Sequence, residues 1–302
     1  MDSIFGNDIY NLIVSYFNDF YDISIFCKVC KSMRYHAYVH NIYLNKSFVS
    51  YLQKIPILNI NLVSMDNIPS QDLTLDHCIN YKELQMVSLV RGLIDYNTYN
   101  ILSILQKLCI LKMKCSRINF IPITNSMTSL EWTNCIPMQC RFIQTYNNII
   151  ALHLDHFNFN FTSIHITYFP NLEYLYIKDN SQNTIIKSIS LSRAISDLSK
   201  LRFLYYENII LNHKDLSKLK KLEYLCVGNP LRIMDLPIMP NILYLGLDTF
   251  EYTYLEYNNK FPNLIYFFND DITYISPNII LWNDEKHLSI KKQYYMAYFD
   301  KR

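Results

Sequence analysis

A chain of 302 residues with 50% apolar composition can bury a large hydrophobic core, in one elongated or two compact domains. The formal net charge of +2 creates no field that favours nucleic acid or an anionic membrane surface, so we expect neither as a partner. Only four glycines are present, which excludes the closely spaced glycines of dinucleotide loops, phosphate loops and nucleophile elbows.

The amino terminus shows no targeting signal. No cationic region precedes an apolar segment there, and no apolar run in the chain reaches the ~18 residues that a membrane span needs. Eight cysteines in a chain without an export signal indicate reduced thiols rather than disulfides. We therefore expect a cytoplasmic protein, or a nuclear one.

Residues 1–48 fit no repeat and show helical periodicity. Apolar side chains recur at helical spacing through residues 9–17 and again through residues 25–33. The segment is expected to form a small domain of two or three short helices.

Four stretches of this segment resemble the F-box. They are FGNDI from Phe5, IVSYF from Ile13, DI from Asp22 and VCKSMR from Val29, against the family pattern L-P-x-E-I, I-x-x-Y-L, D-L and V-C-K-x-W-R. Gly6 and the methionine of the last stretch replace the usual proline and tryptophan. The bias of the whole chain toward Ile, Asn, Tyr and Lys indicates an AT-rich genome, such as that of a protist or a large DNA virus.

The F-box resemblance implies docking on a Skp-type adaptor of a cullin-based ubiquitin ligase, which would be the host's if the protein is viral. The adaptor-binding positions that it implies are Phe5, Ile9, Ile13, Ile23, Val29, Cys30 and Met33. The alternative is that these helices only seal the first edge of a repeat protein.

Four residues near the end of this segment have metal-ligand chemistry. They are Cys27, Cys30, His36 and His40. The spacer of five residues between the cysteine and histidine pairs is short for structural zinc, and one continuous helix would point the two pairs in opposite directions. We expect no metal and no cofactor, and interpret Cys30 as a buried interface thiol.

Residues 49–284 carry a recurring pattern of apolar-x-x-apolar-x-apolar, as in Leu172, Leu175 and Ile177. Its starting positions are 57, 84, 108, 127, 149, 172, 201, 222, 242 and 264. Their spacing resembles that of leucine-rich repeats, at about 20 to 29 residues each. The resemblance implies an α/β fold, a curved solenoid of about ten repeats whose parallel sheet lines the concave side. The alternative is a non-repeating α/β domain with chance matches.

Each repeat is expected to be a short strand followed by a return segment. The longest interval, which holds IIKSISLSRAISDL from Ile185, has helical spacing and should carry a helix on the convex side. Intervals of 19 to 22 residues leave room only for extended or 3₁₀ returns. Side chains suited to satisfy backbone groups at the turn out of the strand are Asn180, Asn229, Cys115 and Cys135.

Aromatic residues recur at the second and fourth positions after the repeat starts, which should point outward from the concave side. Seven of them are our candidate target-binding residues: Tyr174, Tyr176, Phe203, Tyr205, Tyr224, Tyr244 and Tyr266. Strands lie about 4.8 Å apart, so these side chains should form an exposed aromatic ladder with a shallow gap over Cys226 and Gly246. The alternative is that the rings stack only to pack neighbouring strands.

His153, Asp155 and His156 are the best acid–base candidates in the chain. The register of the recurring apolar pattern, which we call the frame, places His153 and Asp155 side by side on the exposed concave face. No nucleophile or carboxylate pair stands beside them there. We therefore expect solvated surface residues and no catalytic site.

Residues 285–302 are expected to form a helix that caps the open edge of the last strand. Together these features predict a monomeric, non-enzymatic substrate-recognition subunit of a cullin-type ubiquitin ligase. It would bind the adaptor through residues 5–34 and a target protein through the concave face. The alternative function is a leucine-rich repeat interaction scaffold with a helical cap and no link to a ligase.

Overall fold

The computed structural model describes twelve parts of the chain. They are residues 42–43, 64–70, 84–119, 123–137, 145–157, 166–179, 185–207, 211–228, 236–247, 259–268, 280–281 and 284–299. These belong to two compact units, unit 1 (residues 1–127 and 137–141) and unit 2 (residues 128–136 and 142–302). The short strand β6 (Ile136–Pro137) lies at the boundary between them.

Unit 1 contains four parallel strands in chain order. They are β1 (Ile42–Tyr43), β2 (Ser64–Pro69), β3 (Met86–Ile94) and β4 (Ile110–Ile118). Helix α6 (Tyr96–Ser103) follows β3, and the carboxylate of Asp95 caps it by accepting a hydrogen bond of 3.0 Å from the backbone N–H of Thr98. The spacing of the repeat starts did not predict this helix.

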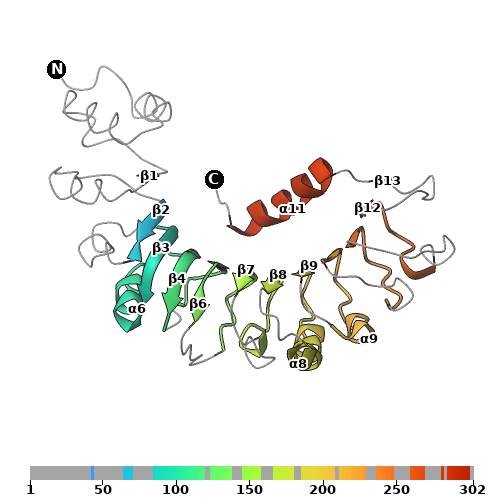
Figure 1. Ribbon diagram of the computed structural model, residues 1–302, viewed down its shortest axis with the longest axis horizontal. Helices are drawn as coiled ribbons and strands as arrows, with labels where there is room; N and C mark the ends of the chain where they lie inside the picture. The colour runs from blue at the N-terminus through green and yellow to red at the C-terminus, as the bar shows by residue number, and fades with distance from the viewer. Residues whose placement is uncertain are drawn as a thin grey trace, which may run out of the picture. The chain divides into compact units, whose positions relative to one another are not determined.

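Unit 2 contains a longer, curved run of parallel strands (Figure 1). In order, they are β5 (Ser129–Thr133), β7 (Ala151–Phe157), β8 (Tyr174–Asp179), β9 (Phe203–Glu207), β10 (Tyr224–Val227), β11 (Tyr244–Leu247), β12 (Tyr266–Phe268) and β13 (Ile280–Leu281). Helices α8 (Ile185–Ser196) and α9 (His213–Leu216) lie on the convex side, and α11 (Asp284–Phe299) lies on the concave side.

The predicted frame sets the strand register. Leu175 pairs with Leu152 on one side and with Leu204 on the other, and Leu204 pairs in turn with Leu225. Residues of the frame from position 84 onward are buried in the core of their units. A matching register and one return segment per strand make each unit a stack of leucine-rich repeats, as predicted.

A further apolar side chain is buried three residues before most repeat starts. These residues are Leu105, Tyr146, Phe169, Leu198, Leu219, Met239 and Phe261. In several repeats the backbone N–H of the start residue donates to the carbonyl of this residue, for example from Leu201 to Leu198 at 3.0 Å. This tight turn directly precedes each strand, and its apolar side chain adds a layer to the core beneath the strand.

Asparagines directly before three repeat starts in unit 2 form a ladder along the solenoid. Each donates its side-chain Nδ2–H to the backbone carbonyl at the equivalent turn of the preceding repeat. The pairs are Asn171 with Asn147 at 2.7 Å, Asn263 with Pro240 at 2.8 Å, and Asn241 with Lys220. The asparagines that the sequence singled out, Asn180 and Asn229, lie outside the described residues.

Four residues at the seventh position after a repeat start have left-handed backbone conformations. They are Arg91, Cys115, Asn134 and His156, with φ between 49° and 52°. The register of β7 against β8 shifts at this point, between Leu154 and Phe157, so the chain leaves the strand through a bulge. Cys115 therefore lies in the exit turn, as expected. Cys135 follows Asn134, the left-handed residue of its own repeat; it is buried, and its thiol lies 3.5 Å from the carbonyl of Thr133.

The structure corrects the two ends of the repeat frame. Met65 of β2 pairs with Val87, so the strand before β3 starts after the frame that we placed at residue 57. At the other end, Ile280 of β13 pairs with Tyr266, which adds a strand that the frame did not contain. Both terminal repeats lack regular leucines, and their register follows from pairing with neighbours.

The convex helix predicted from residue 185 is confirmed as α8. The expectation of only extended or 3₁₀ returns in the shorter intervals is wrong for the segment after β9, where α9 forms one helical turn capped by the side chain of Asn212. No helix in the described ranges has the length and apolar character needed to cross a membrane.

Candidate functional site

The aromatic ladder predicted on the concave face of unit 2 is present. Tyr174, Phe203, Tyr224, Tyr244 and Tyr266 are direct neighbours in the strand register. The centroids of successive rings along this column lie 4.3, 4.2, 6.2 and 5.2 Å apart. Three of these pairs are stacked across the sheet, whereas the rings of Tyr224 and Tyr244 are tilted by 34°.

A second stack runs beside the first. The ring centroid of Tyr176 lies 4.0 Å from that of His153 and 4.3 Å from that of Tyr205. Next in register come Cys226 and Gly246, so the side chains do become smaller where we expected a gap. His153 was not predicted to join this stack, and its Nδ1 also lies 3.1 Å from the hydroxyl of Tyr174.

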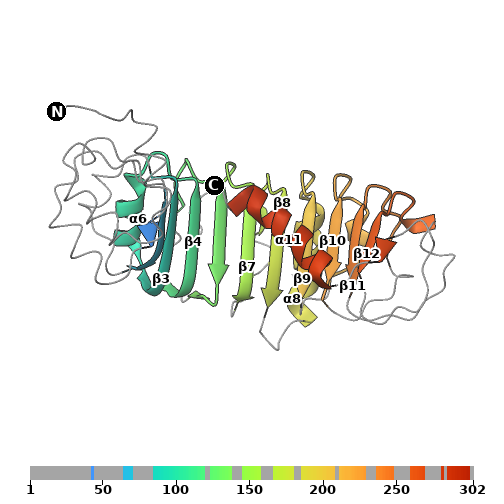
Figure 2. The ribbon, with the colours of Figure 1, turned by 90° about the horizontal axis from the view of Figure 1, so that it is seen from above.

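Helix α11 lies along the concave side of unit 2 and runs obliquely across its strands (Figures 1 and 2). Among its described side chains, those that contact the sheet share one face, at spacing i, i+3, i+4, i+7 and i+8. They are Lys291, Tyr294, Tyr295, Tyr298 and Phe299. Residues of the opposite face are exposed: Lys292, Gln293, Met296 and Ala297.

Three tyrosine hydroxyls of α11 donate hydrogen bonds to glutamates of three different repeats. The pairs are Tyr294 with Glu223 at 3.4 Å, Tyr298 with Glu173 at 3.1 Å, and Tyr295 with Glu131. Hydrogen bonds to a carboxylate are stronger than those between neutral groups. This set of bonds fixes the position of the helix along the sheet.

Aromatic packing adds to these hydrogen bonds. Phe299 is fully buried, and its ring meets those of His153 and Tyr174 nearly edge-on, at centroid distances of 5.9 and 5.6 Å. Tyr294 packs on Phe203 and Tyr224 at 5.2 and 5.5 Å. The end of α11 and the ladder therefore form one aromatic cluster.

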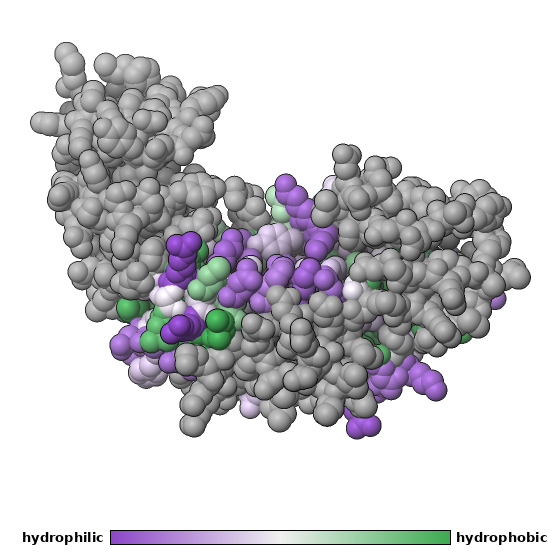
Figure 3. Space-filling model, in the orientation of Figure 1, coloured by the Kyte–Doolittle hydropathy of each residue, from purple (hydrophilic) through white to green (hydrophobic). Residues whose placement is uncertain are grey.

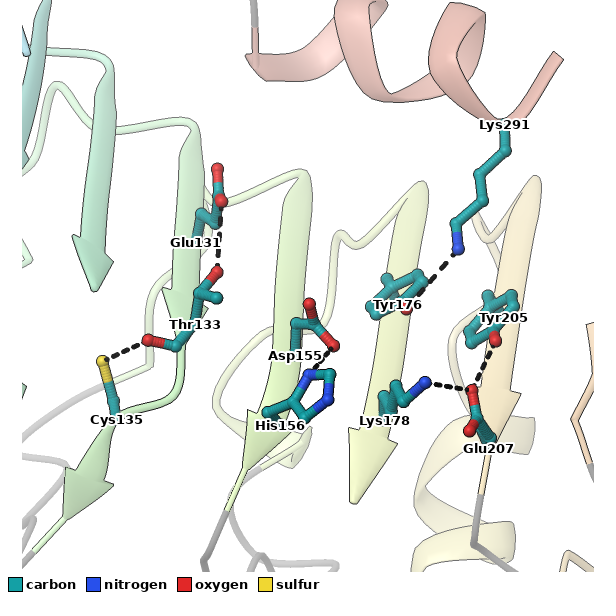
Figure 4. A network of polar contacts seen from close by, with 10 residues as sticks. All are labelled: Glu131, Thr133, Cys135, Asp155, His156, Tyr176, Lys178, Tyr205, Glu207 and Lys291. Atoms are coloured by element: carbon teal, nitrogen blue, oxygen red, sulfur yellow. Dashed lines mark hydrogen bonds and ion pairs between the residues drawn. The ribbon is translucent and has the colours of Figure 1, made fainter. Parts of the chain in front are cut away.

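Lys291 reaches from α11 to the second stack (Figure 4). Its Nζ lies 4.6 Å from the ring centroid of Tyr176 and 4.2 Å from that of Tyr205, which places the charge over both rings. The same atom is 3.5 Å from the hydroxyl of Tyr176. Burial lowers the pKa of the Lys291 ammonium. The site therefore binds a lysine side chain mainly through aromatic faces.

Charged residues lie along the strand ends beside this stack (Figure 4). Lys178 forms an ion pair of 2.9 Å with Glu207, which also accepts a hydrogen bond of 2.6 Å from the Tyr205 hydroxyl. In a separate contact, Nδ1 of His156 lies 2.8 Å from the Asp155 carboxylate. Of the predicted acid–base pair, Asp155 thus has a partner other than His153.

Four buried tyrosines of the concave face are neutral at ordinary pH. Burial raises the pKa of Tyr174, Tyr176, Tyr205 and Tyr224 above the usual value for a phenol. In α11, burial and the nearby charge of Glu173 raise the pKa of Tyr298 to about 12. The hydroxyls are therefore available as hydrogen-bond donors.

The expectation that the ladder is exposed is wrong for most of its residues. Tyr174, Tyr176, Phe203, Tyr205 and Tyr224 are all at most 8% exposed. The physical reason is that α11 lies over the concave face and packs on their rings. Tyr244 and Tyr266, farther along the column, remain half-buried.

Two related expectations are corrected by the same contacts. His153, which we expected in solvent, is only 9% exposed, and its ring stacks on that of Tyr176. The carboxy-terminal helix forms as predicted, but the side chains that the structure describes in its last turns contact the concave face, whereas we expected the helix at the edge of the last strand. In the space-filling view, hydrophilic side chains gather in the middle of the visible face and hydrophobic ones form smaller groups (Figure 3).

The candidate adaptor-binding residues and the cysteine and histidine set lie outside the described residues. They are Phe5, Ile9, Ile13, Ile23, Val29, Cys30 and Met33 in the first group, and Cys27, Cys30, His36 and His40 in the second. Within the ranges that the structure describes, no group of three or more His, Cys, Asp or Glu side chains could hold a metal ion.

No protein-family model and no curated protein sequence matches the chain. Solved structures similar to it include an internalin (inlF) from Listeria monocytogenes, at 14% identity over 80% of this chain and 68% of that chain, with a TM-score of 0.39. A TLR13–ssRNA13 complex is 19% identical over 78% of this chain and 42% of that chain, with a TM-score of 0.42. The leucine-rich repeat domain of APL1B is 17% identical over 80% and 70% of the two chains, with a TM-score of 0.35.

Proposed function

We propose that this chain is a protein-interaction scaffold whose concave face in unit 2 binds a partner protein. The observation that carries the proposal is the way this face already holds a helix. It combines stacked aromatic rings, three glutamates that accept hydrogen bonds and a lysine-binding pair of tyrosines. Aromatic anchors surrounded by directed polar contacts are typical of protein recognition sites.

The more specific proposal is a substrate-recognition subunit of a cullin-type ubiquitin ligase. It depends on the F-box resemblance of residues 5–34, which would dock on a Skp-type adaptor. The chain itself would contribute proximity and orientation of the target, and the recruited enzymes would transfer ubiquitin. The alternative remains an interaction scaffold without a ligase.

Capture of a purified Skp-type adaptor by the full chain tests the ligase link. We expect retention by the native chain and loss of retention with Ile9→Asp and Val29→Asp together, because both changes place a charge on the proposed apolar docking surface. Circular dichroism of the double variant should match that of the native chain. If a known F-box protein retains the adaptor under the same conditions and this chain does not, the ligase proposal is wrong.

Affinity capture of the full chain, followed by identification of the retained proteins, tests the scaffold proposal. Tyr266→Ala is the most informative variant of the ladder, because Tyr266 is half-buried whereas Tyr174, Phe203 and Tyr224 belong to the packed cluster. We expect it to weaken target capture and to leave adaptor capture unchanged. Equal target capture by the two chains would remove Tyr266 from the binding surface.

A further inference from the structure

The contact between α11 and the concave face combines ring packing with hydrogen bonds from side-chain ends. Among the side chains of α11 that the structure describes, Lys291, Tyr294, Tyr295 and Tyr298 contact the face and keep part of their surface exposed, and Phe299 is fully buried. One bond reaches the helix backbone, from the Ser129 hydroxyl to the carbonyl of Tyr298 at 2.7 Å. Contacts of this kind resemble a protein–protein interface more than the closely packed aliphatic core beneath the strands.

The chemistry of the face is selective for the helix that it holds. Glu131, Glu173 and Glu223 come from different repeats, and each accepts a bond from a different tyrosine hydroxyl of one helix face. The rings of Tyr176 and Tyr205 accept a lysine ammonium at a fourth point. A helix without hydroxyl donors at this spacing would leave Glu131 and Glu173 without these bonds on a partly desolvated surface, whereas Glu223 would keep its ion pair of 2.9 Å with Arg202.

We propose that the concave face of unit 2 is a helix-recognition site and that α11 is its internal occupant. The external partner would be another protein's helix that carries lysine at position i, tyrosines at i+3, i+4 and i+7, and an aromatic residue at i+8. This inference deepens the proposed interaction function and rests on it. To bind, the partner must displace α11.

The covalent linkage of α11 sets the threshold for that exchange. A tethered ligand has an effective concentration in the millimolar range when its linker is short, so an external helix competes at a disadvantage. Its apparent dissociation constant is the intrinsic value divided by the fraction of molecules in which the face is open. Changes that weaken only the attachment of α11 should therefore strengthen binding of an external helix.

The test uses the full chain and a fluorescent peptide of residues 284–302 as the probe, with binding followed by fluorescence anisotropy. In the variant chain, Tyr294→Phe and Tyr298→Phe together remove two hydroxyl donors to glutamate and retain the rings. We expect the native-sequence peptide to bind this variant at least ~10-fold more tightly than the native chain. A peptide that carries the same two changes should bind the variant chain at least ~10-fold more weakly than the native-sequence peptide.

The matched control is Lys292→Ala with Met296→Ala, on the exposed face of the same helix. This chain should bind the peptide as the native chain does. Lys291→Ala provides a second weakened chain, since it removes the side chain that lies over the rings of Tyr176 and Tyr205 and leaves the three tyrosine–glutamate bonds in place. It should also bind the peptide more tightly than the native chain.

Equal peptide binding by the native and both weakened chains, or binding to none of them while circular dichroism shows them folded, would overturn the inference. A stable dimer formed by exchange of α11 between copies, detected by light scattering, would also overturn it, because the occupant would be a second copy of the chain. The peptide assay requires neither adaptor nor target. Its failure can therefore be separated from failure of target capture.

Discussion

Gly228 lies directly against the side chain of Glu207 in the neighbouring repeat. A Cβ at position 228 would be 2.5 Å from Cγ and 2.9 Å from Cβ of Glu207. Since both atoms are close to the backbone, Glu207 could not make room by a rotation of its carboxylate alone. The glycine therefore allows two repeats to approach beside the second aromatic stack.

Gly228→Ala should destabilise the chain. The added methyl must displace Glu207, which weakens its contacts with Lys178 and the Tyr205 hydroxyl. We expect a loss of about 1–3 kcal/mol in the free energy of unfolding, measured in urea. Glu207→Ala removes Cγ, the atom closest to the added methyl group. In that background Gly228→Ala should therefore lower the free energy of unfolding by less. Equal costs in the two backgrounds would contradict the steric explanation.

Tyr206→Phe should stabilise the chain. Tyr206 occupies a core position of the repeat at 1% exposure, and its hydroxyl has no hydrogen-bond partner among the described residues. Removing a buried polar group that makes no hydrogen bond should raise the free energy of unfolding by about 1 kcal/mol. Tyr205→Phe is the matched control, because the Tyr205 hydroxyl does donate to Glu207 and its loss should not stabilise. A decrease in stability for Tyr206→Phe would show that its hydroxyl has a partner.

The asparagine ladder gives a third stability prediction. Asn263→Asp replaces the donor that faces the Pro240 carbonyl with an acceptor, so the bond is lost and the two oxygens repel. We expect a decrease of about 0.5–1.5 kcal/mol in the free energy of unfolding. Asn259→Asp, at an exposed position, adds the same charge and should change stability little. If both variants lose the same amount, the added charge and not the ladder is responsible.

The sequence predicts the register of unit 2 well because a strand alternates with a period of two. Once Leu175 and Ile177 are assigned to the core, Tyr174 and Tyr176 must point to the other face, and the repeat spacing then aligns them with Phe203 and Tyr205. The same logic fails at the ends of the frame. Near Met65 the pattern is weak, and only pairing with β3 fixes the register.

The burial of the concave face could not be predicted in this way. The face of α11 that contacts the sheet consists of tyrosines, a lysine and one phenylalanine, which are also common on solvent-exposed helices. Its position depends on complementarity between distant parts of the chain. By contrast, the sequence does contain a pattern that could have predicted the asparagine ladder. The dipeptide Pro-Asn directly precedes the repeat starts at Leu172, Ile242 and Leu264.

Alkaline pH should detach α11 from the concave face. The pKa of Tyr298 is about 12 in the folded chain, against about 10 for a free phenol, because burial and Glu173 favour its neutral form. Its contribution to stability is therefore complete below pH ~10 and is lost as the pH rises through about 12. Burial also raises the pKa of Tyr294, which acts in the same direction.

Deprotonation of Lys291 changes the stability of the attached state in the opposite direction. The two groups, Lys291 and Tyr298, therefore affect different parts of the pH profile. Burial lowers the pKa of Lys291, so the stability of the attached state rises with pH as Lys291 loses its proton, up to about pH 10.5. We expect near-ultraviolet circular dichroism of the tyrosines to hold to pH ~10 and then to collapse as tyrosinate absorbance appears. Tyr298→Phe should lessen the loss of stability between pH 10 and 12, because phenylalanine does not titrate. Lys292→Ala, on the exposed face, should retain the native profile. A collapse of the same size and midpoint in Tyr298→Phe would show that ionisation of Tyr298 does not control the attachment of α11.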